Sequence, residues 1–292
     1  MKPAPFEYFA PKTVDEALAH LAEYGYDAKV LAGGQSLIPM MNFRLVQPAV
    51  IVDINNIDEL SHIRETAEGG LSIGAIARHN QVETSPLVAE RAALISDAMP
   101  HIATIQVRSR GTFGGSIAHA DPSAELTAVS VALDGSFLLR GQRGERWVPA
   151  NEFFAGLFTS VLEPDELLIE AKFPAIPRRS GCALVEVARR PHDFALVGVA
   201  AIVSLGAGDR CQQARVVFFS VGDGPVEAHQ ASELLAGKDL TPELMRAAAE
   251  TAKGEIDPGS DIHASAEYRR HLAGVLSFRA LTRAFDRARV KG

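Results

Sequence analysis

Apolar and polar residues near the start of the chain alternate with the period of an amphipathic helix. From Val14 to Ala22 the apolar side chains recur every three or four residues, which places them on one helix face. Thr13 and Glu16 form a capping box at the start of this helix, and Gly25 stands where a C′ residue is expected. Short apolar or alternating runs predict strands at 28–31, 48–54 and 70–77.

The middle of the chain mixes helical and strand periods. A helix is predicted over 86–98, and a second helix is predicted to open at Asp121-Pro122, with proline in its first turn, and to close at Gly135. The polar segment between Arg108 and Asp121 contains two adjacent glycines and is predicted to be a loop. Alternating residues predict a hairpin with strands at 137–140 and 146–148, and a further strand at 166–173.

A break in every period marks the main domain boundary. Pro174, Pro177 and Gly181 fall within eight residues, so the boundary is expected there, with domains at 1–177 and 178–292. Beyond it the pattern predicts strands at 182–188, 195–205 and 214–221, then helices at 227–235, 241–253 and 265–289. The second domain is therefore expected to be a three-stranded antiparallel sheet with helices, and the fold class α+β.

Composition and charge narrow the classes of partner. The 292 residues are 47% hydrophobic and 22% charged, and the formal net charge is −7. No basic cluster of the kind that binds nucleic acid is present, so no nucleic-acid partner is expected. No apolar run approaches the ~20 residues that span a bilayer. The N-terminal residues lack the apolar core of a secretory signal, so a cytoplasmic protein without a membrane span is expected.

The metal-binding side chains are sparse and scattered. The two cysteines, Cys182 and Cys211, cannot form an iron–sulfur or structural zinc site by themselves. No histidine pair has metal-ligand spacing. We therefore expect no metal on this chain and two buried thiols.

Two diglycine segments are the candidate chemistry. Gly33-Gly34 follows a predicted strand and is flanked by Ser36, and Gly114-Gly115 lies between two hydroxyl side chains. Glycine allows φ > 0 and lets consecutive backbone N–H groups approach a ligand, so each segment could hold a phosphate through the main chain. Each could equally be a plain turn, and Ser36 could be a helix N-cap. Neither segment matches the dinucleotide-binding, P-loop or nucleophile-elbow motif.

The two segments together favour a dinucleotide over a single phosphate, because its diphosphate needs several main-chain donors. Glu125, in the predicted first turn of a helix, is either favoured there by the helix dipole or accepts a hydroxyl of a sugar or ribityl chain. No nucleophile–base or carboxylate pair emerges. The reactive group is therefore expected to be a bound cofactor, with no catalytic side chain on this chain.

Three stretches, at 31–37, 111–125 and 265–272, closely resemble the FAD-binding medium subunit of molybdenum hydroxylases, the carbon monoxide dehydrogenase and xanthine dehydrogenase family. The resemblance extends over essentially the whole chain. It implies a vanillyl-alcohol-oxidase (PCMH)-type FAD-binding domain of two α+β subdomains, at about 1–55 and 56–177. A C-terminal domain of the molybdenum hydroxylase flavoprotein type would follow.

The resemblance also implies residue roles. The segments around Gly33 and Gly114 would hold the FAD diphosphate, Glu125 would bind the sugar and ribityl region, and apolar residues would contact the flavin. Phe194 stands where many members have tyrosine, so any hydrogen bond from a hydroxyl there is absent. The full set of expected FAD-binding residues is Leu31, Ala32, Gly33, Gly34, Gln35, Ser36, Leu37, Ile102, Ala103, Thr112, Gly114, Gly115, Ser116, Asp121, Glu125, Leu168 and Phe194.

By the same resemblance, this FAD accepts electrons from [2Fe–2S] clusters of a small subunit and passes them to an external acceptor. The molybdenum cofactor would lie on a large subunit, in a dimer of heterotrimers. Two alternatives remain: a self-contained FAD-dependent oxidoreductase of the same fold, and an interaction subunit that has lost its cofactor.

Overall fold

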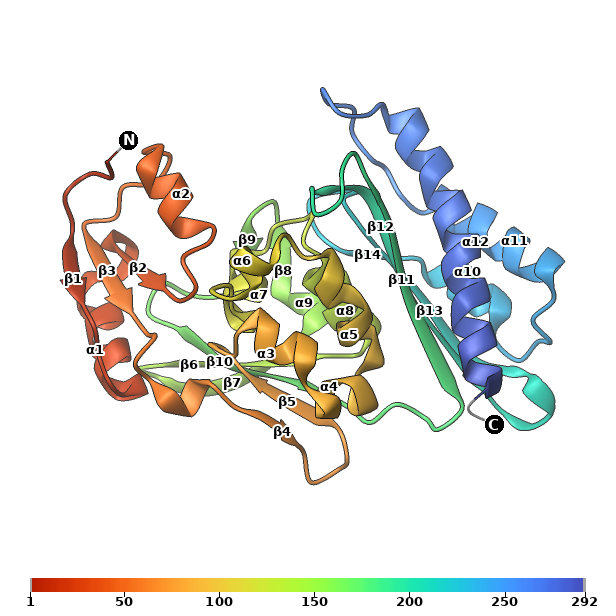
Figure 1. The fold of residues 1–292 in the computed structure, drawn as a ribbon, viewed down its shortest axis with the longest axis horizontal. Coiled ribbons are helices and arrows are strands. Elements are labelled where there is room, and N and C mark those ends of the chain that lie inside the picture. The colour runs from red at the N-terminus through yellow and green to blue at the C-terminus, as the bar shows by residue number, and fades with distance from the viewer. Residues whose placement is uncertain (1, 291–292) are drawn as a thin grey trace.

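The computed structural model describes residues 2–290 and contains three units along its longest axis (Figure 1). The N-terminal unit is a three-stranded parallel sheet in the order β1-β3-β2. Its elements are β1 (Glu7–Phe9), α1 (Val14–Tyr24), β2 (Ala28–Leu31), α2 (Leu37–Asn42) and β3 (Val50–Asp53).

The first helix begins and ends as its caps predict. The Thr13 hydroxyl accepts from the N–H of Glu16 at 3.2 Å, and Gly25 ends α1 with φ +49°. The Glu16 carboxylate reaches one residue further back than expected, to the N–H of Lys12. The helix buries Leu18 and Leu21 against β2 and β3. The first diglycine segment begins two residues after the end of β2.

The central unit is a five-stranded antiparallel sheet, order β4-β5-β10-β6-β7, covered by helices on one side (Figure 1). Its strands are β4 (Ile63–Glu65), β5 (Leu71–Gly74), β6 (Ser136–Gly141), β7 (Gly144–Pro149) and β10 (Leu167–Phe173), with a small hairpin of β8 (Phe154–Gly156) and β9 (Thr159–Ser160). Its helices are α3 (His79–Thr84), α4 (Pro86–Arg91), α5 (Ala93–Ala98), α6 (Ile105–Arg108), α7 (Phe113–His119), α8 (Glu125–Ala132) and α9 (Ala150–Phe153).

Several helices of this unit differ from the sequence prediction. The helix predicted over 86–98 is two helices, interrupted at Ala92. The segment predicted as a loop between Arg108 and Asp121 contains α7, and α8 begins at Glu125 instead of at Asp121-Pro122. The Asp121 carboxylate accepts from the N–H of Ser123 at 2.8 Å, so aspartate and proline form a turn.

The C-terminal unit is an antiparallel sheet, order β11-β12-β13-β14, with α10 and α12 against its outer face and α11 packed on these two helices (Figure 1). Its elements are β11 (Ser180–Ala188), β12 (Ala195–Leu205), β13 (Cys211–Phe219), β14 (Val226–Glu227), α10 (His229–Leu235), α11 (Pro242–Gly254) and α12 (Ala266–Val290). The three predicted strands are present, and the two-residue β14 adds a fourth. None of the helices between residues 2 and 290 is both long and apolar enough to cross a membrane.

The central strand of this sheet is buried on both faces. All 11 residues of β12 are buried, because α8 of the central unit packs on one face and α12 on the other. Ala200 and Phe219 belong to the core shared with the central unit, whereas Val199 and Phe218 belong to the core under the C-terminal helices. This two-sided burial explains why the sequence at 195–205 is almost continuously apolar and does not alternate.

Candidate functional site

The two diglycine segments lie in direct contact. A Cβ added to Gly33 would lie 2.4 Å from the carbonyl oxygen of Arg110 and 2.8 Å from the Cα of Gly111. Both distances are shorter than any ordinary carbon contact. The absence of a side chain at Gly33 therefore lets the end of β2 pack against the chain that enters α7.

The first segment presents a row of backbone donors. Within residues 2–290, the N–H groups of Gly33, Gly34, Gln35 and Ser36 donate to no other protein group. Gly34 has φ +72°, a conformation that favours glycine, and Ser36 precedes α2 without capping it through its hydroxyl. Consecutive unpaired N–H groups in a turn form a concave site for an anion.

The second segment uses its glycines differently from the expectation. Gly114 and Gly115 lie in the first turn of α7 with negative φ, and their N–H groups donate to Ala75 O (2.9 Å) and the Thr112 hydroxyl (3.2 Å). A Cβ on Gly114 would lie 2.6 Å from the Cα of Ala75. These glycines are thus required for close packing of α7 on the central sheet. Their own amides are occupied, so this segment offers a ligand its shape and the hydroxyl of Ser116.

A polar network that the sequence did not suggest ties the two segments together. Asn55 donates through Nδ2 to the carbonyl oxygen of Ala32 at 2.8 Å. The guanidinium of Arg78 donates to Oδ1 of Asn55 and to the carbonyl oxygen of Arg110. Asp53 accepts from the N–H of Asn55 at 2.9 Å and from the hydroxyl of Tyr8 at 2.6 Å. The position of Asp53 and Asn55 at the end of a buried strand was the signal that could have indicated them.

A buried arginine shapes the segment around Ile102 and Ala103. Arg108 is 7% exposed, pairs with Glu83 at 2.8 Å, and donates to the carbonyl oxygens of Ile102 and Ala103 at 3.0 and 2.8 Å. Ala103 has φ +43°, so these bonds hold a strained turn. Leu168, on β10, belongs to the large core cluster of the central unit that also contains Ile102.

His79 lies beneath the second segment. Its N–H donates to the carbonyl oxygen of Gly111 at 2.9 Å, and a Cβ on Gly111 would approach its ring to 3.0 Å. Burial lowers the pKa of His79 to about 4, so the ring is neutral at physiological pH. A neutral ring provides packing under the segment without adding charge.

The acidic residues lie at the junction with the C-terminal sheet. Glu125, the first residue of α8, is 9% exposed, and burial raises its pKa to about 7. Glu186 on β11 adds a further upward contribution to the pKa of Glu125, and Glu186 itself pairs with His101 at 3.1 Å. The neighbouring Pro122 accepts from the N–H of Ser220 at 2.9 Å. Both sides of the domain junction therefore contribute to this region.

Phe194 comes from the C-terminal unit. It directly precedes β12, and 72% of its surface is exposed, which is unusual for an aromatic side chain beside a buried strand. The structure thus brings 31–37 into contact with the chain entering 112–116, and joins Asp121 and Glu125 to the sheet that carries Phe194. Within the described part of the chain, no three His, Cys, Asp or Glu side chains cluster in a way that could hold a metal ion.

Family models match nearly the whole chain. The FAD binding domain in molybdopterin dehydrogenase matches residues 4–176, and the CO dehydrogenase flavoprotein C-terminal domain matches residues 183–284.

Known proteins of similar sequence are subunits of dehydrogenases. The carbon monoxide dehydrogenase medium chain of Hydrogenophaga pseudoflava is 40% identical over 288 residues, covering 98% of this chain and 99% of the relative. The 6-hydroxypseudooxynicotine dehydrogenase complex subunit alpha of Paenarthrobacter nicotinovorans is 39% identical over 289 residues, covering 99% and 97%.

Solved structures agree in fold. A chain of carbon monoxide dehydrogenase from Hydrogenophaga pseudoflava matches with a TM-score of 0.95 and 40% identity, covering 98% of this chain and 99% of that one. A chain of quinoline 2-oxidoreductase from Pseudomonas putida 86 matches with a TM-score of 0.94 and 36% identity, covering 99% of both. The protein therefore belongs to the family of FAD-binding medium subunits of molybdenum hydroxylases, and its fold is the FAD-binding and C-terminal domain pair of that family.

Proposed function

We propose that this chain holds FAD along the two contacting diglycine segments and serves as an electron-transfer subunit of a molybdenum-dependent hydroxylase. The observation that supports this most directly is the row of N–H groups from Gly33 to Ser36, which have no acceptor among the residues that the structure describes. Such a row fits the oxygens of a diphosphate. The same turn lies against the chain that enters α7, so a ligand held there would extend along both segments.

The proposed roles follow the position of each residue in the fold. Residues 31–37, with Thr112, Gly114, Gly115 and Ser116, would surround the diphosphate. Asp121 and Glu125 would accept hydroxyls of the sugar and ribityl region. Ile102, Ala103 and Leu168 would provide apolar contacts, and the exposed ring of Phe194 would pack against the flavin from the C-terminal unit.

The chemistry of the reaction belongs to the cofactor and not to a side chain. When bound, FAD would supply electron exchange between one-electron and two-electron carriers. The chain's own residues would bind it, orient it and limit water around it. The burial of Glu125 and His79 fits this role.

Its relatives are subunits of multi-subunit dehydrogenases, and the partners proposed here are of two kinds. A small subunit with [2Fe–2S] clusters would deliver electrons to this chain, which would pass them to an external acceptor. A large subunit with the molybdenum cofactor would oxidise the substrate. We propose a dimer of such heterotrimers in the cytoplasm.

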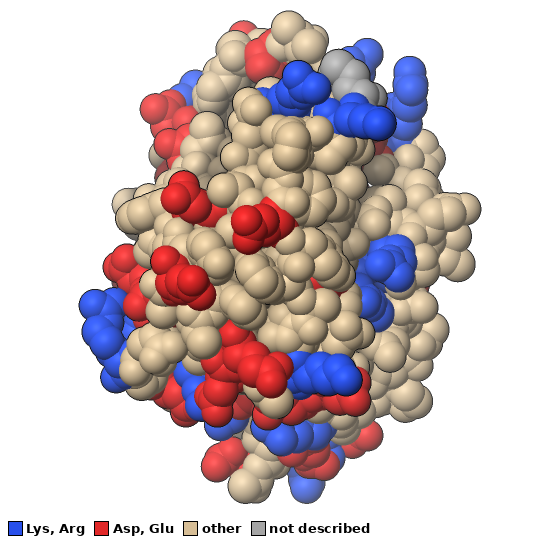
Figure 2. Space-filling view, turned by 90° about the vertical axis from the view of Figure 1, so that its left-hand side faces the viewer, with Lys and Arg blue, Asp and Glu red and all other residues tan. Residues whose placement is uncertain are grey.

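On the face of the N-terminal unit drawn in Figure 2 most residues are uncharged, and charges of both signs gather at the lower edge.

The domain limits are part of the same proposal. A division at 177/178 lies in the segment without helix or strand between β10 and β11. The family matches end at residue 176 and resume at residue 183, which supports it. The two subdomains at about 1–55 and 56–177 would correspond to the three-stranded and five-stranded sheets.

Flavin analysis of tagged wild-type protein and of two glycine variants tests the proposal. The wild-type chain, purified from its native host with its associated subunits, should contain about one FAD per chain. Gly33→Ala should lower FAD affinity about tenfold or more. The added Cβ would push the first segment away from the carbonyl oxygen of Arg110. A loss of ~1.4 kcal/mol in binding free energy is enough for a tenfold effect. Gly259→Ala is the matched control, since its added Cβ would meet nothing within 4 Å.

The outcomes separate the proposal from its alternatives. A colourless wild-type protein, with no flavin released on denaturation, would contradict FAD binding and favour a cofactor-free subunit. Substrate turnover by the purified chain without any other subunit would instead favour a self-contained oxidoreductase. Metal analysis of the co-purifying subunits should find molybdenum and iron there.

A further inference from the structure

Arg269 is a buried arginine near the start of α12, within the 265–272 stretch that the FAD site does not use. Its residue surface is 8% exposed. A buried guanidinium is unfavourable unless its charge is paired and its donors are satisfied. The presence of arginine there calls for a specific set of partners.

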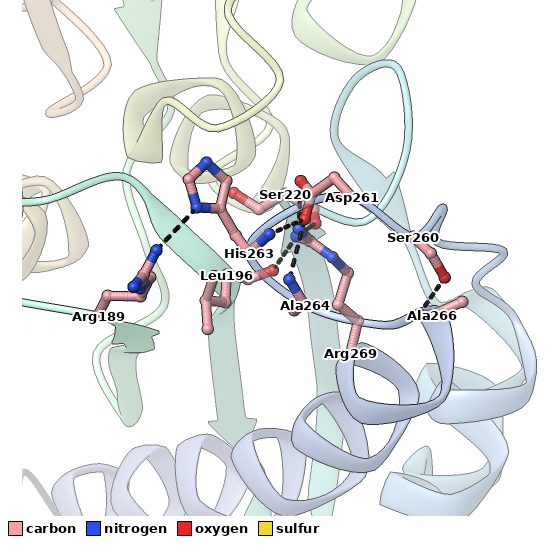
Figure 3. Close-up of polar contacts among 9 residues, drawn as sticks. All are labelled: Arg189, Leu196, Ser220, Ser260, Asp261, His263, Ala264, Ala266 and Arg269. Atoms are coloured by element: carbon pink, nitrogen blue, oxygen red, sulfur yellow. Dashed lines mark hydrogen bonds and ion pairs between the residues drawn. The ribbon is translucent and has the colours of Figure 1, made fainter.

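Those partners lie on β12, directly after β13 and in one turn (Figure 3). One terminal nitrogen of Arg269 donates to the carbonyl oxygens of Leu196 (2.6 Å) and Ser220 (3.3 Å), and the other pairs with Asp261 at 2.7 Å. Leu196 is the second residue of β12, and Ser220 directly follows β13. One side chain thus joins α12 to the same end of two adjacent strands.

Asp261 is the centre of a tight turn. Its Oδ1 accepts from the N–H groups of His263 (2.8 Å) and Ala264 (2.9 Å), while Oδ2 pairs with Arg269. These amide hydrogen bonds and the guanidinium lower the pKa of Asp261 to about 2. The turn therefore keeps a permanent negative charge opposite Arg269.

The same turn holds the other end of the segment that contains Phe194. The Arg189 side chain lies 3.2 Å from Nδ1 of His263 (Figure 3). Phe194 is between Arg189 and Leu196, so residues 189–196 are anchored at both ends by one turn and its arginine partner. The exposed ring of Phe194 is on the anchored segment.

Ser220 connects this anchor to the acidic part of the FAD site. Its N–H donates to the carbonyl oxygen of Pro122, between Asp121 and Glu125, while its own carbonyl oxygen accepts from Arg269. Ser220 has φ +61°, an unfavourable conformation for serine that needs such bonds on both sides.

We propose that Arg269 is a positioning residue, which sets the placement of the Phe194 segment and of the Ser220 turn against the FAD site. The proposal rests on the FAD role given above. Arginine suits this position because its planar fork supplies several donors in fixed directions, whereas a lysine ammonium could satisfy these acceptors only in part.

Hydrogen–deuterium exchange on the full chain tests the positioning itself. Arg269→Met removes the charge and the donors but keeps an apolar stem, and it should raise amide exchange at 189–196 and around Ser220. Arg270→Met is the matched control: Arg270 is its partly exposed neighbour and, within residues 2–290, its ion-pair partner is Asp257 at the surface. The control should exchange like the wild type. Unchanged exchange in Arg269→Met, or an increase spread evenly over the C-terminal sheet, would overturn the proposal.

The flavin reduction potential tests the link to the cofactor. Arg269→Met should keep its FAD stoichiometry and show a shifted potential, Arg269→Lys should show a smaller shift, and Arg270→Met should show none. If Arg269→Met does not fold, Arg269→Lys and Asp261→Asn are measured in its place, with the same expected direction. A wild-type potential in variants with raised exchange at 189–196 would refute the link. Absence of FAD from the wild type would refute the proposed function alone, since the exchange experiment needs no flavin.

Discussion

Glycine serves three different physical needs in the candidate site. At position 34 glycine allows a positive φ, and at position 33 it allows two backbone segments to touch. At position 114 it allows a helix to pack on Ala75. The pattern of two diglycine pairs predicted a single reason, main-chain approach to a ligand. Among the described residues, only the first pair has backbone N–H groups left for that purpose.

Glu125 combines burial with neighbouring acidic groups, and this makes its contribution to stability pH-dependent. Its pKa is raised to about 7 from an ordinary value of 4.5, so the folded chain keeps a proton between these values that the unfolded chain releases. The free energy of unfolding therefore contains a contribution that falls as pH rises from 4.5 to 7 and is constant above. Its full size is about 3 kcal/mol at most.

The Glu125→Gln variant isolates this contribution. Glutamine cannot ionise, so the variant should gain stability relative to the wild type between pH 5 and 8, by up to about 3 kcal/mol. Urea unfolding of the flavin-free chain at several pH values measures the difference. Comparison at each pH removes the opposite trend from His79, whose lowered pKa makes stability rise with pH between about 4 and 6.5. A stability difference that does not vary with pH would show that Glu125 is ionised throughout.

The loops and helices around the site depend on long-range contacts. The polar stretch between Arg108 and Asp121 has few apolar positions and was predicted to be a loop, yet α7 forms there. Thr112 caps α7, and both ends of the helix pack into the central core. Tertiary packing of this kind stabilises short helices whose own propensity is weak.

Asn55 and Arg78 should stabilise FAD binding by holding the two diglycine segments together. Asn55→Ala and Arg78→Met should each raise the FAD dissociation constant about 5- to 30-fold, the effect of losing about 1–2 kcal/mol of hydrogen bonding. Because both act through one network, the double variant should lose less than the sum of the two. Titration of the flavin-free protein with FAD measures all three.

Arg143→Met is the control for a lost surface arginine, since Arg143 is exposed and its nearest carboxylate lies 3.9 Å away. It should bind FAD like the wild type. Strict additivity of Asn55→Ala and Arg78→Met would mean that the two residues act independently. The proposed coupling would then be wrong.

At the scale of the whole molecule, the central and C-terminal units meet at a sheet whose strand β12 is buried on both faces in the described structure. Phe218 and Phe219 are neighbours on β13 that point into different cores, and both are fully buried. The ring of Phe219 also covers Gly198, where a Cβ would lie 1.9 Å from a ring carbon. The junction between the central and C-terminal units is thus filled by buried side chains.

Two alanine substitutions test this two-sided burial. Phe218→Ala and Phe219→Ala should each lower the free energy of unfolding by about 3–5 kcal/mol, the usual cost of removing a buried phenylalanine ring. Phe43→Ala, at a phenylalanine with 66% exposure, should change it by less than about 0.5 kcal/mol. Urea unfolding measures all three. A small effect at either Phe218 or Phe219 would mean that its face of the sheet is accessible to solvent.

Features with a local cause could be predicted from the sequence alone. The α1 caps, the three long strands of the C-terminal sheet and the three C-terminal helices follow from nearest-neighbour chemistry and from periodicity, because such patterns depend on residues a few positions apart. The family membership also follows from the sequence, since its motifs are continuous stretches of chain.

Features that join distant residues were decided only by the tertiary structure. The contact of Gly33 with Arg110, the bridge of Asn55 and Arg78, and the anchoring of residues 189–196 by Arg269 each join segments that are far apart along the chain. The start of α8 at Glu125 is of the same kind, because Asp-Pro opens a turn as readily as a helix and the packing selects the turn. Local propensity leaves such choices open, and burial against a distant partner resolves them.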